Sequence, residues 1–443
     1  MTGQIRKRQL VLSTFVQLYG THGGAWRRPG VEAGGNPDFQ RWLELVKLLE
    51  KGKFDLAFFA DFVGNSGDDV GRGSRHARGG GFEPLTLLGA LATQTRHIGL
   101  VATVNTNFNQ PYNLARQMAS LDHLSGGRVG WNIVSSLSEG AIKSFGVKNP
   151  LAHDQRYARA DEFVETAKRL WDSWDDGAFD HVDKQSGVFF DPAAAHPTHF
   201  HGEHIDVDGL LDIARPIQGY PVFFQAGNSE TGREFAAKHA ELIYAAAQNI
   251  EEAQSFYADV KGRMAKYGRE PDELIVSPGL FYHIGSSRQE AEEKHRAFEE
   301  AVDVSGRHNL FGVDLSQHSL DGPLPDNLPE PTNGVGRWRQ AVALARRENL
   351  TIRQLFVRFS AVQGHRTVVG TPADIADQIE DWFLNGAADG FNLKPSLLPD
   401  DLQDFIDLVV PELQKRGIFR TEYQGSTLRE HLGLARPGNR HRL

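Results

Sequence analysis

Short apolar runs alternate with amphipathic helical patterns along this chain of 443 residues. Eight runs have the length and near-continuous hydrophobicity of buried strands, at residues 10–18, 55–61, 98–104, 128–134, 221–226, 242–247, 274–284 and 390–394. Helical patterns cover residues 37–49, 84–93, 113–124, 157–171, 230–239, 251–267, 372–384 and 402–416. The alternation predicts an α/β fold with a parallel sheet covered by helices. Eight units favour closure into a (β/α)8 TIM barrel over an open doubly wound sheet.

Four stretches are too long and too rich in Gly, Pro and His to be plain connections. They are residues 62–82, 137–155, 175–219 and 305–363, and we expect them to be insertions in one domain spanning residues 1–443. Three follow the carboxyl ends of strands, where barrels build their sites. The Gly-rich run from Gly64 to Gly81 suggests either a flap that orders over a ligand or a disordered surface loop. Residues 421–443 are polar with few apolar anchors, which predicts a surface arm that contacts another subunit.

Composition narrows the classes of partner. The net charge of −9 argues against nucleic acid or an anionic membrane as the main partner. The absence of cysteine excludes disulfides and thiolate metal sites, and it fits a reducing compartment. No apolar run approaches the roughly 20 residues of a transmembrane helix, and the N-terminus lacks the form of a signal peptide. We therefore expect a soluble cytoplasmic protein.

The segment from Gln117 to Ser136 forms one helix-to-strand unit, with a Gly126–Gly127 stop between the two elements. Its letters, ASLDHLSGGRVGWNIVSS, resemble a segment of the bacterial-luciferase-like flavin monooxygenases, in the group of nitrilotriacetate, dibenzothiophene-sulfone and long-chain alkane monooxygenases. The resemblance extends from Trp26 to Gly417. It implies a TIM barrel and an enzyme that uses FMN.

The resemblance also implies a two-component reaction. A separate NAD(P)H:FMN reductase would supply FMNH2, and O2 would add at C4a to give a peroxyflavin that oxygenates a small organic substrate. The chain has no G-x-G-x-x-G fingerprint after a strand, which suits a protein that does not reduce its own flavin. We expect a homodimer or homotetramer. The alternatives are a deazaflavin-dependent oxidoreductase, a non-catalytic flavin-binding barrel and a metal-dependent hydrolase, the last disfavoured because residues 18–22 hold a single histidine.

Polar side chains follow the second, third and fourth predicted strands. Asp61 ends an apolar run, where a carboxylate needs a partner: either it caps a loop or, as the resemblance implies, it contacts the flavin. Thr103 and Asn105 end the third strand and can reach the same cavity, and Asn132 and Ser136 end the fourth. Amide and hydroxyl groups match the carbonyl oxygens and nitrogens along the edge of an isoalloxazine ring.

Two further motifs carry the predicted cofactor site. His153 and Tyr157 match a His-Asp-x-Arg-Tyr motif of the family, which assigns Tyr157 to the phosphate or ribityl chain; a plain helix start explains Asp154 but not Tyr157. The fifth strand runs into a helix through Ala226, Gly227, Asn228 and Ser229. Small residues and exposed backbone N–H groups at a helix start attract an anion, although the same letters also make an ordinary N-cap. The resemblance assigns this turn to the FMN phosphate.

The catalytic candidates are His22, after the first strand, and His308, in the insertion after the seventh. The run of His196, His199, His201 and His204 suggests a metal site on spacing alone. The resemblance instead makes residues 201–207 a structural hairpin, so no metal is expected. Leu137 and Ser66 depart from the alkane-oxidising relatives, which argues against an alkane substrate.

Overall fold

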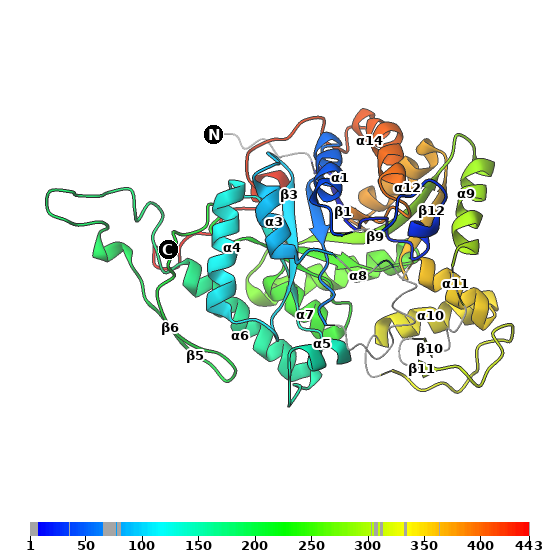
Figure 1. Ribbon diagram of the computed structural model, residues 1–443, viewed down its shortest axis with the longest axis horizontal. Coiled ribbons are helices and arrows are strands. Elements are labelled where there is room, and N and C mark those ends of the chain that lie inside the picture. The colour runs from blue at the N-terminus through cyan, green and yellow to red at the C-terminus, as the bar shows by residue number, and fades with distance from the viewer. Residues whose placement is uncertain are drawn as a thin grey trace.

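Eight parallel strands close into a barrel in the computed structural model, which describes residues 8–34, 36–64, 77, 81–302, 304, 309–310, 313–331, 335–362 and 364–442 (Figure 1). The strands are β1 (Val11–Phe15), β2 (Leu56–Phe59), β3 (Gly99–Asn105), β4 (Val129–Val134), β7 (Val222–Gln225), β8 (Leu242–Ala245), β9 (Ile275–Ile284) and β13 (Gly390–Leu393). They pair in this order, and β13 returns to β1. The (β/α)8 TIM barrel predicted from the alternation is confirmed.

Helices surround the barrel (Figure 1). They are α1 (Phe39–Lys51), α3 (Pro84–Ala92), α4 (Pro111–Ser125), α5 (Glu139–Ser144), α6 (His153–Trp171), α7 (Glu230–His239), α8 (Ile250–Gly262), α9 (Arg288–Glu300), α10 (Val335–Glu348), α11 (Ile352–Val362), α12 (Pro372–Leu384), α13 (Asp400–Asp404), α14 (Val410–Lys415) and α15 (Leu428–Leu432). A π-helical turn, Phe405–Val409, joins α13 to α14. None of the described helices combines the length and the apolarity that crossing a bilayer requires.

The unit from α4 to β4 shows how local sequence sets these elements. Pro111 occupies the first turn of α4, where its missing N–H costs nothing. Gly126 ends the helix with a φ of 70°, a left-handed conformation that glycine adopts without a Cβ penalty. The chain then enters β4, whose residues 129–133 are all buried. The predicted glycine stop is therefore confirmed.

The sequence pattern did not predict a ninth parallel strand, β12 (Arg366–Gly370). It pairs with residues 280–284 of β9, while β8 pairs with residues 275–278. The long β9 therefore carries two short strands in succession along one edge. β12 is only five residues long, ends in a glycine and directly follows the stretch that was expected to be an insertion. Its pattern was therefore too weak to distinguish it from that stretch.

The C-terminal segment closes the floor of the barrel. Leu428, Leu432 and Leu434 are buried against the first residues of the strands, such as Val11 and Leu56. The expectation of a surface arm is therefore wrong for this part of residues 421–443. Leu428 and Leu432, four positions apart, form the apolar face of the short helix α15, but so few apolar residues did not predict burial of the segment.

The insertions contain structure of their own. Residues 175–219 include an antiparallel hairpin of β5 (Thr198–His201) and β6 (Asp206–Gly209), as the resemblance implied. Residues 137–155 include α5, and residues 305–363 include α10, α11 and the pair β10 (Asn309–Leu310) and β11 (Val313–Asp314). Figure 1 shows the β5–β6 insertion and the α10–α11 unit on opposite sides of the barrel. Most of the Gly64–Gly81 run lies outside the described residues.

Candidate functional site

The carboxyl ends of β3 and β4 bring two predicted residues together inside the barrel. Thr103 and Asn132 are register partners, and the Asn132 amide donates a hydrogen bond to Thr103 Oγ1 at 2.9 Å. Both residues are buried. The other end of the amide, Asn132 Oδ1, is buried without a hydrogen-bond partner among the described residues. A buried orphaned acceptor is costly, so this atom points to a bound donor.

Asn105 has a different role at the end of β3. Its amide donates to the backbone carbonyl of Ser136 at 2.6 Å, and its Oδ1 accepts from the N–H of Asn107 at 2.8 Å. Asn107 in turn donates to the carbonyl of Ser135 at 2.8 Å. These bonds tie the loop after β4 to the loop after β3. Asn105 and Ser136 are thus brought together. The hydrogen bonds of the Asn105 side chain stabilise this side of the barrel mouth, the open end that the carboxyl ends of the strands form.

The turn at residues 226–229 lies at the start of α7. Ser229 caps the helix by accepting the N–H of Gly232 at 3.1 Å. Gly227 is tightly enclosed, because a Cβ added there would lie 2.4 Å from Gln225 Nε2 and 3.1 Å from the Tyr157 hydroxyl. Tyr157 of α6 therefore reaches this turn, as predicted. Asn228 Oδ1 is a second buried acceptor without a described partner.

His153 and Asp61 lie nearer the surface. The exposed His153 ring packs beside Tyr157, with 5.2 Å between ring centroids, at the first turn of α6. Asp61 follows β2 and is partly buried. Burial, together with the nearby carboxylate of Glu83, raises the pKa of Asp61 to about 6. This carboxyl group consequently exchanges its proton close to neutral pH.

His22 lies across the barrel from the 226–229 turn, because β1 and β7 are four places apart in the closed order of eight strands. The His22 side chain is buried, and its Nδ1 accepts the N–H of Gly24 at 3.1 Å. Its ring contacts the edge of Phe298 on α9, at 5.2 Å between centroids. The second catalytic candidate, His308, lies outside the described residues.

Alternation along β9 reveals an inward-facing residue that the sequence reading missed. Leu280, Tyr282 and Ile284 of β9 pack into the core beneath the helices, so the alternate residues Gly279 and His283 lie on the opposite, inward face. Burial, and then the neighbouring His295 and His22, lower the pKa of His283 to about 3. The ring is therefore neutral at physiological pH. Counting by twos along the predicted strand would have identified it.

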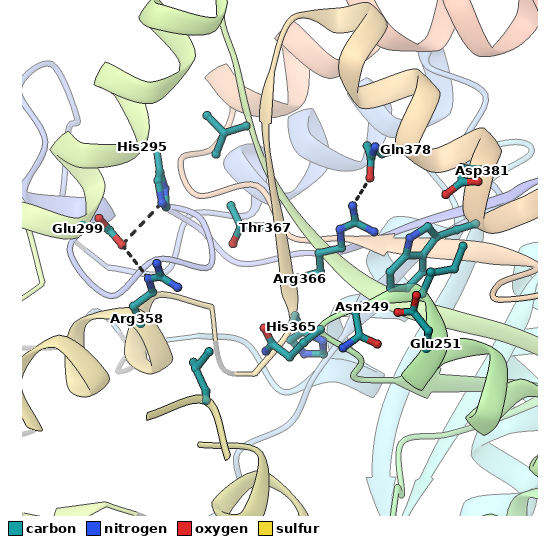
Figure 2. A pocket seen from close by; sticks show the side chains of 15 residues that line it. Asn249, Glu251, His295, Glu299, Arg358, His365, Arg366, Thr367, Gln378 and Asp381 are labelled. Atoms are coloured by element: carbon teal, nitrogen blue, oxygen red, sulfur yellow. Dashed lines mark hydrogen bonds and ion pairs between the residues drawn. The ribbon is translucent and has the colours of Figure 1, made fainter. Parts of the chain in front are cut away.

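A cavity of about 510 Å³ lies at the rim beside β12, between α9, α11, α12 and the start of α8 (Figure 2). On one wall Glu299 lies between His295 and Arg358, at 3.6 Å and 3.9 Å. On another, Arg366 donates to Gln378 and stacks on Trp382 at 4.7 Å. None of the predicted cofactor residues lines this cavity, so the cavity is separate from the predicted flavin site.

The chemistry of the mouth fits a flavin. Asn132 Oδ1 is a neutral acceptor inside the barrel, suited to a ring N–H group. The first turn of α7, with its Ser229 cap, presents backbone N–H groups suited to a phosphate. Tyr157 adds a hydroxyl beside that turn. The fit rests on the orphaned amide oxygens of Asn132 and Asn228, two of the three buried asparagine oxygens that lack a hydrogen-bond partner among the described residues.

Known proteins are similar to this chain in sequence and in architecture. A model of the luciferase-like monooxygenase family matches residues 14–389. The chain is 45% identical to nitrilotriacetate monooxygenase component A of Aminobacter aminovorans, over 98% of each protein, and 42% identical to N-acetyl-S-(2-succino)cysteine monooxygenase of Bacillus subtilis (strain 168), over 98% of this chain and 99% of the relative. A solved riboflavin lyase with modified FMN and riboflavin superposes with a TM-score of 0.83 at 31% identity, over 97% of both chains. The chain therefore belongs to the flavin-dependent luciferase-like monooxygenase family and is a monooxygenase.

Proposed function

We propose that the protein is the oxygenase component of a two-component system and uses FMNH2 delivered by a separate NAD(P)H:FMN reductase to oxygenate a small organic substrate with O2. The observation that carries the proposal is the pair of orphaned buried acceptors, Asn132 Oδ1 and Asn228 Oδ1, at the carboxyl ends of neighbouring strands β4 and β7. Reduced flavin, when bound, supplies the electrons that activate O2. A relative named component A supports a partner protein.

The residues of the mouth divide the work of holding the cofactor. Asn132 would accept a ring N–H, while its bond to Thr103 fixes the orientation of the amide. Backbone N–H groups at residues 226–229 and the Tyr157 hydroxyl would hold the phosphate end, and Asp61 would contact the ring or ribityl region from β2. The loop bonds of Asn105 keep the wall between these groups in place. The protein thereby supplies orientation and a water-poor pocket.

His22 is the proposed catalytic residue. It lies opposite the 226–229 turn, on the side of the mouth away from the residues that would hold the phosphate. The hydrogen bond that His22 Nδ1 accepts from the N–H of Gly24 sets the orientation of the ring, and imidazole is the side chain best suited to hold or move a proton near neutral pH. His283, kept neutral by burial, lies close enough to interact electrostatically with His22.

Turnover tests the proposal directly. The purified chain would be mixed with O2 and either nitrilotriacetate or N-acetyl-S-(2-succino)cysteine, the compounds named for two relatives. One arm contains FMN, NADH and an unrelated flavin reductase, and the other contains NADH alone. We expect product only in the first arm. Product formed with NADH alone would contradict the two-component proposal.

A matched pair of variants tests His22. His22→Ala should reduce kcat in the reductase-coupled assay and leave the dissociation constant of FMN unchanged. The control is His97→Ala, because His97 is an exposed histidine that stacks on Tyr423 away from the mouth. Equal activity of the two variants would remove His22 from the mechanism.

A further inference from the structure

The β5–β6 hairpin gathers four potential metal ligands on one face. Its register pairs His199 with Asp208 and His201 with Asp206. Alternate residues of a strand share a face, so these two histidines and two aspartates all project from the same side. The opposite side carries Phe200 and packs toward the body of the protein, where Arg169 of α6 lies 5.4 Å from the Phe200 ring. The ligand-bearing face is exposed to solvent.

The side chains on this face already converge. His201 lies between two carboxylates, with Nδ1 bonded to Asp206 Oδ1 and Nε2 3.5 Å from Asp208 Oδ1. His199 Nδ1 lies 2.6 Å from the same Asp208 oxygen. One ligand atom from each of His201, Asp206 and Asp208 falls within 4.8 Å of the others. A tetrahedral ion with bonds of about 2.0–2.2 Å requires donors about 3.3–3.6 Å apart, and His201 Nε2 and Asp208 Oδ1 already lie 3.5 Å apart.

The backbone beneath the cluster is held rigid. The Glu162 carboxylate on α6 accepts the N–H groups of Glu203, His204 and Ile205, at 2.9, 2.8 and 2.9 Å. Gly202 closes the turn by donating to the carbonyl of Ile205 at 2.8 Å. The two strands therefore keep their register without an ion. Binding does not have to order a loop, which lowers its entropic cost.

We propose that this hairpin face is a binding site for a divalent transition-metal cation such as Zn²⁺, formed by His201, Asp206 and Asp208 with His199 as a fourth donor. Imidazole with carboxylate is a donor set that suits Zn²⁺ and its neighbours in the first transition row. With neutral histidines the four side chains carry two negative charges, which a divalent ion balances. The site lies on the β5–β6 insertion, away from the flavin mouth, and the ion would bridge the two strands. It replaces the expectation of no metal.

Titration calorimetry of tag-free, chelator-treated full-length protein with ZnCl2 tests the site. We expect one ion per chain with micromolar affinity. His201→Ala and Asp208→Asn should each weaken binding about tenfold or more, and His199→Ala should weaken it less. Glu203→Gln removes a carboxylate from the same turn and His181→Ala removes an exposed histidine elsewhere, so both controls should bind as the parent does.

Co²⁺ provides an independent readout that does not depend on the heat of binding. The visible absorption of Co²⁺ should become intense on binding to the parent and to both controls, and should stay weak with Asp208→Asn. No saturable one-to-one binding, or losses in the controls equal to those in His201→Ala, would overturn the proposal.

Discussion

Asn132 donates its side-chain amide to Thr103 Oγ1 across neighbouring strands at 2.9 Å, which leaves its own oxygen buried without a described partner. The bond fixes which end of the amide faces the barrel mouth. A hydroxyl group on β3 thereby orients an acceptor on β4. We expect this acceptor to meet the flavin ring.

Replacing Thr103 with valine should loosen that orientation. Valine has a volume similar to that of threonine but lacks the hydroxyl, so FMN binding should weaken by about 1 kcal/mol, roughly fivefold in Kd. Thr166→Val is the control, because Thr166 is also buried and bonds only within α6. Fluorescence titration with FMN measures both. Similar Kd values for the two variants would show that Thr103 has no positioning role.

Ser229 and Ser287 are matched N-caps of α7 and α9. Replacing either with alanine should cost about 1 kcal/mol of unfolding free energy, as the loss of a cap does. Only Ser229→Ala should also weaken FMN binding, because only α7 begins at the predicted phosphate turn. Urea unfolding and FMN titration of both variants separate the two effects. Equal FMN affinity in the two variants would move the phosphate elsewhere.

Two arginines with similar partners differ in burial. Arg420 pairs with Asp55, which is fully buried and also accepts the N–H of Leu12 at 2.8 Å, whereas Arg442 is exposed and pairs with Asp175, which His196 also contacts at 3.0 Å. Arg420→Met strands a buried carboxylate and should cost about 3–5 kcal/mol. Arg442→Met should cost less than about 1 kcal/mol. Comparable losses in urea unfolding would contradict the buried pairing.

The pH dependence of stability should report on His239. Burial, and then the nearby Lys168, lower its pKa to about 4, against the opposing bond to Asp161. Between pH 6.5 and 4 the unfolded chain therefore binds a proton that the folded chain does not. The neutral, buried His239 therefore costs no stability above pH 6.5. As the pH falls below 6.5 the free energy of unfolding decreases, by about 2 kcal/mol at pH 5.

The variant His239→Gln keeps a donor for Asp161 but cannot titrate. The free energy of unfolding of the parent should fall between pH 7 and pH 5 by about 2 kcal/mol more than that of the variant. His181→Gln, at an exposed position, should behave as the parent does. Identical pH profiles for the parent and His239→Gln would show that His239 does not titrate as described.

Local patterns predicted the barrel well because each strand and its helix are defined within a short stretch. Gly126 and the apolar run after it define a complete unit without distant partners. The missed elements depend on distant contacts. The leucines of α15 are buried only because the barrel floor lies against them, and β12 is a strand because the upper half of β9 offers a free edge.

The residues of the candidate site likewise include some that local sequence motifs predicted and others that they did not. Thr103, Asn132, Tyr157 and Gly227 carry sequence motifs, and the structure brings them to the mouth in two pairs, Thr103 with Asn132 and Tyr157 with Gly227. His283 and His365 carry no motif. The position of His283 follows from the alternation along β9, whereas that of His365 depends on how the segment before β12 packs, which no local pattern encodes.

Anaerobic titration with reduced FMN tests the central claim most directly, on the parent chain, Asn132→Ala, Asn228→Ala and Asn385→Ala. Asn385 lies at the exposed end of α12 and serves as the control. The account predicts one FMNH2 per parent chain, a loss of about 1–3 kcal/mol of binding free energy in each of the first two variants, and no change in the third. Binding that does not saturate, or that is equally tight in all four proteins, would contradict it.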